Sequence, residues 1–279
     1  MWLLRTLGAV STSRAATFSL TASGSMAVAA APVASAPAVL SIAAMSGLGP
    51  MDVPDPFLFC VFHLDSYPAG DPAHMFAPRR GNGADFDWAA PYRMYHGARV
   101  PGFPRHPHRG FETLTIVLRG LVDHADSLGS SGRYGEGDMQ WLTAAGGVQH
   151  QELFPLVRAD APNTLHLYQI WLNLPAKSKL APPGYAMPWA EAVGRVEGAG
   201  GAPPPRSWAA EPGADVGVFV VRLPPGGALT LPAAAGGDGT SRVALGPLGA
   251  GVEVEGARTP RRARVALRHA GCADACRLR

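Results

Sequence analysis

Two short motifs in the middle of the chain contain side chains that can ligate a metal ion or transfer protons. The first is an H-x-H pair, His106 and His108, and the second is an H-x-E pair, His150 and Glu152. In a β-strand, residues two apart project from the same face, so each motif directs two such side chains together. The spacing therefore predicts that imidazoles and a carboxylate converge on one cation.

This donor set narrows the chemistry of the site. Buried imidazole and carboxylate groups need partners or a metal ion to offset their desolvation. Imidazoles and a carboxylate without thiolate suit Fe, Mn, Ni, Cu or Zn, and a redox-active metal with open positions would allow dioxygen chemistry. Isolated H-x-H pairs are more often ordinary surface or core histidines, and the residues alone leave both interpretations open.

The next predicted strand continues this alternation of side-chain directions. Glu112 shares even numbering with His106 and His108, and also with Leu114 and Ile116. If the face that carries the two aliphatic residues is the inside of a barrel, both histidines and the glutamate point inward as well.

Short β-rich segments separated by glycine turns run through the middle of the chain and predict an all-β fold, an antiparallel barrel or sandwich. No G-x-G-x-x-G motif followed by a βαβ unit is present, which argues against a nucleotide-binding fold. The predicted strands are 57–64, 111–118, 121–126, 139–143, 148–154, 164–174 and 216–223.

The motifs resemble those of the pirin family of the cupin superfamily. The two main segments are GFPRHPHRGFET (102–113) and GDMQWLTAAGGVQHQE (137–152). Supporting segments are DPFLF (55–59), RRGNGADF (79–86), PYRMYHG (91–97) and QIWLNLP (169–175).

The resemblance implies a bicupin, two β-barrels face to face, with a metal ion in the N-terminal barrel. It implies that His106, His108, His150 and Glu152 are the ligands and that the metal is Fe(2+), other divalent transition metals remaining possible. Glu112 would be a structural residue and not a ligand.

The family resemblance also implies an activity. Members resemble quercetin 2,3-dioxygenases, oxidoreductases that open a flavonol with O2 and release carbon monoxide, and Glu152 would then be the catalytic base. Phe103, Phe111 and Trp141 would line an apolar mouth for a flat ligand, or else belong to the core.

Two other functions remain open at this stage. Some pirins resemble iron-dependent, redox-sensing regulators that bind a protein partner without turnover. A cupin that holds its metal for stability alone is the third alternative. The enzyme is the preferred interpretation.

The basic net charge of +3 belongs to the ends of the chain. Residues 1–51 contribute +2 and residues 258–279 contribute +6, so residues 52–257 carry −5. A mildly acidic body does not support a direct nucleic-acid partner. Three cysteines are too few for a disulfide scaffold.

Residues 1–48 are free of acidic residues and rich in Ala and Ser with scattered Arg, which is typical of an organelle transit peptide, for a chloroplast more than a mitochondrion. A disordered tail is the alternative, with the protein then in the cytoplasm or nucleus. Residues 26–45 are uncharged, but two prolines make them a poor membrane span, so no membrane partner is expected.

The remaining boundaries follow composition and resemblance. Residues 52–190 are the predicted N-terminal pirin cupin domain, and 191–213 are a linker. Residues 214–257 are a partial C-terminal cupin, and 258–279 are a basic tail in which no strand or helix periodicity is recognised. The second barrel is therefore expected to be truncated or divergent, which would leave unpaired strand edges.

Overall fold

The fold was analysed in a computed structural model of the whole chain. It describes residues 51, 53, 55–78, 89–93, 95–192, 207–211, 214 and 216, together with the strands at 2–5, 39–44, 217–220, 229–231, 241–245, 253–254, 257–258, 263–268 and 276–278. The RRGNGADF segment at 79–86 lies outside these residues, as does most of the predicted transit peptide.

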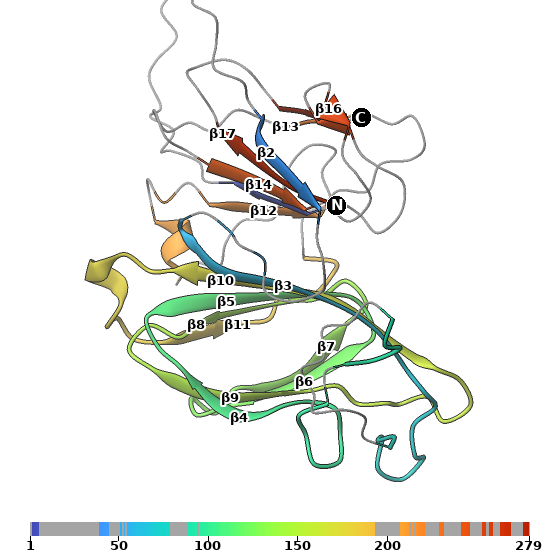
Figure 1. The fold of residues 1–279 in the computed structure, drawn as a ribbon. Coiled ribbons are helices and arrows are strands. Elements are labelled where there is room, and N and C mark those ends of the chain that lie inside the picture. Colours follow the sequence, from blue (N-terminus) through green and yellow to red (C-terminus); the bar gives the residue numbers. More distant parts are fainter. Residues whose placement is uncertain are drawn as a thin grey trace, which may run out of the picture.

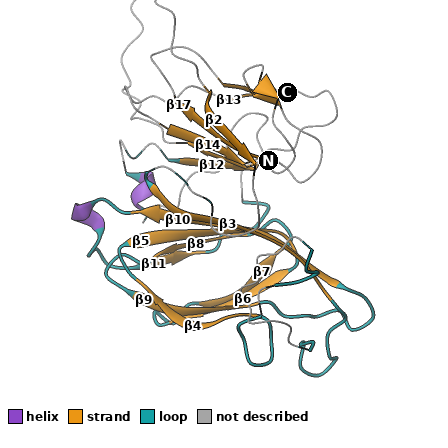
Figure 2. Ribbon diagram, viewed as in Figure 1, coloured by secondary structure: helices purple, strands orange, loops and turns teal. Residues whose placement is uncertain are grey.

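The regular secondary structure of the described residues is almost entirely β-strand, which confirms the predicted all-β class (Figures 1 and 2). The exceptions among the described residues are two short 3-10 helices, Ala176–Ser178 and Trp208–Ala210. Two sheets face each other and form a barrel. The first has the order β11 (Gly184–Ala186), β8 (Met139–Thr143), β5 (Phe111–Arg119), β10 (Asn163–Asn173) and β3 (Phe57–Tyr67). The second has the order β4 (Gly102–His108), β9 (Val148–Leu153), β6 (Leu121–Asp126) and β7 (Ser131–Gly135).

Both faces of the first sheet are buried, and they belong to different cores. Val117 and Leu167 point into the barrel and pack with Val122 and Tyr134 of the second sheet. Each such buried aliphatic side chain stabilises the fold by about 1.5–3 kcal/mol. Apolar side chains therefore pack the interior of the barrel, and polar side chains occupy only part of it.

The opposite face of the first sheet packs against the segment that follows the barrel. Leu114, Ile116 and Trp141 form one cluster with Ala209 and Val216. The even-numbered residues of β5 thus lie outside the barrel, and the expectation that they face its interior is wrong. The cause is Gly110, whose φ of +81° breaks the alternation between β4 and β5.

A second group of strands lies above the β10–β3 side of the barrel in Figure 1. One sheet has the order β12 (Gly217–Val220), β1 (Trp2–Arg5), β14 (Ser241–Leu245), β17 (Ala263–Arg268) and β2 (Val39–Ala44). Another has the order β13 (Leu229–Leu231), β18 (Cys276–Leu278), β15 (Glu253–Val254) and β16 (Ala257–Arg258).

Both ends of the chain contribute strands to these sheets. The N-terminal strands β1 and β2 pair with β12, β14 and β17. The arginine-rich end, in which no strand or helix was predicted, contains β17 and β18. The predicted domain boundaries and the truncation of a second barrel stay predictions. No helix in the described part of the chain is long and apolar enough to cross a membrane.

Candidate metal centre

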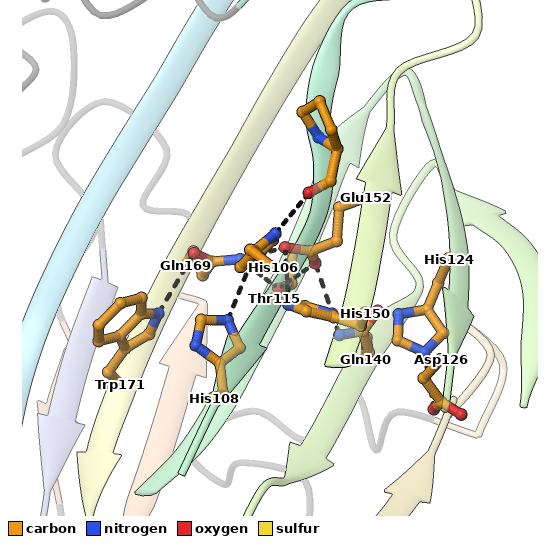
Figure 3. Close-up of polar contacts among 11 residues, drawn as sticks. His106, His108, Thr115, His124, Asp126, Gln140, His150, Glu152, Gln169 and Trp171 are labelled. Carbon is orange, nitrogen blue, oxygen red and sulfur yellow. Dashed lines mark hydrogen bonds and ion pairs between the residues drawn. The ribbon is translucent and has the colours of Figure 1, made fainter. Parts of the chain in front are cut away.

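The second sheet brings the predicted histidines together from two neighbouring strands. β4 pairs antiparallel with β9, and His106 lies opposite His150 in the register. The ligand atoms of His106, His108 and His150 all lie within 4.8 Å of one another. The predicted convergence of the three imidazoles is therefore present (Figure 3).

His106 and His108 present their Nε2 atoms to each other at 3.2 Å. His106 Nδ1 lies 2.7 Å from the carbonyl oxygen of Pro104, a contact in which the ring nitrogen donates. With Nδ1 protonated, Nε2 carries the lone pair that a metal ion requires. Two nitrogens bound at about 2.1 Å with an angle between 90° and tetrahedral stand about 3.0–3.4 Å apart, so the pair fits two ligands of one ion.

His150 completes the set in a buried position. Neither of its ring nitrogens has a hydrogen-bond partner among the described residues. Burial lowers the pKa of His150 to about 3, and the neighbouring His106 and His124 add to the effect. Burial likewise lowers the pKa of His108 to about 3. Neutral imidazoles with unused nitrogen atoms are the chemical form that ligates transition metals, so the residues present fit a metal ion.

Glu152 lies beside the triad, its Oε2 3.9 Å from His150 Nε2. Gln169 Nε2 donates to the same oxygen at 2.8 Å. Thr115 and Gln140 approach Oε1 at 3.4 and 3.5 Å, at the edge of hydrogen-bonding range. The carboxylate therefore faces the histidines, fixed mainly by Gln169, and its assignment as fourth ligand and base stays a prediction.

Glu112 lies on the outer face of the sheet. It is 1% exposed and accepts from the side chains of Trp141, Thr143 and Ser207 and from the backbone N–H of Trp208. It joins the barrel to the following segment, in keeping with the structural role that the family resemblance implies.

The aromatic residues proposed for the mouth separate into two groups. Phe111 lies 5.0 Å from His108 between ring centroids, and Phe103 lies 6.2 Å from His106. Trp141 belongs to the outer core, where its indole N–H donates to Glu112. Trp171, which the sequence analysis did not single out, stacks on Phe111 at 4.6 Å and lies 5.1 Å from His108.

A second histidine and carboxylate lie behind His150. His124 and Asp126 form a fully buried pair at 3.0 Å between Nε2 and Oδ2, and the His124 ring is 5.4 Å from that of His150 (Figure 3). The H-x-D spacing on β6 repeats that of the two predicted motifs, and this signal could have identified the pair.

The chain thus forms a barrel of two antiparallel sheets, with three inward histidines that could hold a metal ion. The sequence profile of the pirin family matches residues 80–172, about a third of the chain. The solved structure of a quercetin 2,3-dioxygenase from Acinetobacter baumannii superposes with a TM-score of 0.50 at 22% identity, covering 86% of this chain and 81% of that one. That likeness shows the fold.

Curated relatives match a stretch of similar length. A Pseudomonas aeruginosa protein named "Putative quercetin 2,3-dioxygenase PA2418" is 46% identical over 99 residues, which are 36% of this chain and 35% of that protein. A "Pirin-like protein" of Solanum lycopersicum is 44% identical over 84 residues, 30% of this chain and 27% of that protein. The matched part spans about a third of these relatives. The region matched by the family profile, residues 80–172, contains all four predicted ligands.

Proposed function

We propose that the barrel binds a divalent iron ion and opens flavonols such as quercetin with O2. The observation that carries the proposal is the convergence of His106, His108 and His150 within 4.8 Å, with the Glu152 carboxylate beside them. The name of the Pseudomonas relative supplies the reaction class. An iron(II) ion in this site supplies Lewis acidity and redox chemistry.

The side chains around the triad suit a flat, acidic substrate. Phe111 and Trp171 stack with an interplanar angle of 21°, and both are half-buried next to His108. Such a pair offers an aromatic face against which a planar ring packs. Glu152 takes the proton of the flavonol hydroxyl, because a fixed carboxylate at the site is within reach of a bound hydroxyl group. Gln169 keeps that carboxylate oriented.

The proposal is tested by loading the full chain with Fe(II) under anaerobic conditions and then adding O2 and quercetin. We expect the flavonol absorbance to bleach and carbon monoxide to be released. Elemental analysis is expected to show near-stoichiometric iron that is lost in His106→Ala and His150→Ala. Iron retained in both variants overturns the metal assignment. A folded, iron-loaded sample without turnover overturns the dioxygenase and favours the regulatory alternative.

A further inference from the structure

A cavity of about 200 Å³ lies at the end of β5 that is opposite Phe111. It opens between the turn at Arg119–Leu121 and the loop that leads from Phe154 to Leu165. β5 contains nine residues, so its two ends are about 27 Å apart at 3.3–3.4 Å per residue. The cavity is thus separate from the aromatic pair beside His108.

Two arginines, Arg119 and Arg158, are among the residues that line this cavity. Neither forms an ion pair with any residue that the structure describes. The acidic lining residue, Glu136, already accepts a hydrogen bond from the Gly120 N–H at 2.8 Å through Oε1. Arg133 on β7, by contrast, is paired with Asp123 at 2.6 Å. The cavity therefore carries an excess of positive charge with unused donors.

The rim that carries Arg158 is held in place by the backbone. Asn163 accepts from the Arg158 N–H at 2.9 Å and donates to the Arg158 carbonyl at 3.0 Å, and it also donates to the carbonyl of Pro68. The Gly70 N–H donates to the same Arg158 carbonyl at 2.8 Å. A loop fixed in this way loses little entropy when a ligand binds.

Apolar side chains form much of the remaining lining, beside Tyr67, Asn163 and Thr164. Leu121, Leu156 and Val157 face the cavity together with two prolines, and Val157 is 44% exposed. The volume is below the roughly 300–1,000 Å³ of sites for drug-sized ligands. We propose that this cavity binds a small organic carboxylate with an apolar body of one ring or a short chain, its carboxylate held by Arg119 and Arg158.

The test is calorimetric titration of the full chain with benzoate as the probe. Benzamide has the same shape without the charge, and acetate has the charge without the apolar body. We expect benzoate to bind at least about tenfold more tightly than either, since a hydrogen bond to a charged group is worth that factor or more. Binding is expected to persist in His150→Ala, which separates this cavity from the metal site.

Arg119→Ala and Arg158→Ala are each expected to weaken benzoate binding about tenfold. Arg109→Ala removes an exposed arginine from the opposite end of β5 and is the matched control. All three arginines are exposed, so the variants retain the fold. Equal binding of benzamide, unchanged binding in both cavity variants, an equal loss in Arg109→Ala, or no heat of binding at millimolar benzoate each overturns the proposal.

Discussion

At the scale of single residues, Gln169 links the predicted base to the aromatic pair. Its Nε2 donates to Glu152 at 2.8 Å, and its Oε1 accepts from the Trp171 indole at 3.3 Å. Both groups of one amide are thus used, and the amide orientation follows from them. Gln169 is therefore a positioning residue for the carboxylate.

Replacing Gln169 by leucine removes both hydrogen bonds and keeps most of the side-chain volume. We expect iron affinity to fall about 10- to 100-fold, the usual cost of losing a group that orients a ligand. Competition with a chelator of known affinity measures the change. Gln149→Leu, on the exposed side of β9, is the control and is expected to leave affinity unchanged. Wild-type affinity in Gln169→Leu would show that the carboxylate needs no such support.

The spacing of the histidines predicted their convergence, because alternation along two strands is a local property. The contacts of Glu152 with Thr115 and Gln169 were not predictable in this way. They join residues 37 and 17 positions apart on different strands. The register of β5 and β10 places Thr115 opposite Gln169, and the packing of the two sheets across the barrel brings Glu152 of β9 to them.

At the scale of elements, β-rich segments bounded by turns are predicted as strands, whereas strands that contain proline or glycine are missed. The segments 121–126 and 139–143 are strands with the predicted bounds. β4 and β7 were not among the predicted ranges. β4 contains Pro104 and Pro107, and β7 contains Gly132 and Gly135, residues that are rare inside strands.

Glu112 holds the segment after the barrel onto the outer face of the first sheet. It accepts four hydrogen bonds, two of them from Ser207 and Trp208. Glu112→Ala leaves buried donors without an acceptor, and we expect the free energy of unfolding to fall by at least about 2 kcal/mol. Urea unfolding measures the loss.

The same variant separates a structural role from ligation. We expect the folded fraction of Glu112→Ala to retain its iron, since Glu112 lies outside the barrel and the histidines lie inside it. Glu191→Gln, at an exposed position, is the control for loss of a negative charge. Iron loss from a folded Glu112→Ala, or unchanged stability, contradicts the assignment.

At the scale of the whole molecule, the two basic ends pair within one sheet. β1 lies between β12 and β14, and β17 lies between β14 and β2. The organelle address of residues 1–48 stays a prediction, but its removal would take two of five strands from this sheet. The strands that place the metal centre begin at Phe57 or later and pair only with each other.

The two halves of the chain should therefore respond differently to loss of the N-terminus. Deleting residues 1–48 leaves β12 and β14 with unpaired backbone groups at new edges, and such edges promote association. We expect the shortened chain to form aggregates on size-exclusion chromatography and to keep the iron content of its soluble fraction. Leu4→Pro, which interrupts pairing with Val218 and Val243, should reproduce the effect. Leu20→Pro, outside the described strands, is the control. Loss of iron would show that the metal barrel depends on residues 1–48. A shortened chain that remains monomeric would show that β1 and β2 are not needed to cover the edges of this sheet.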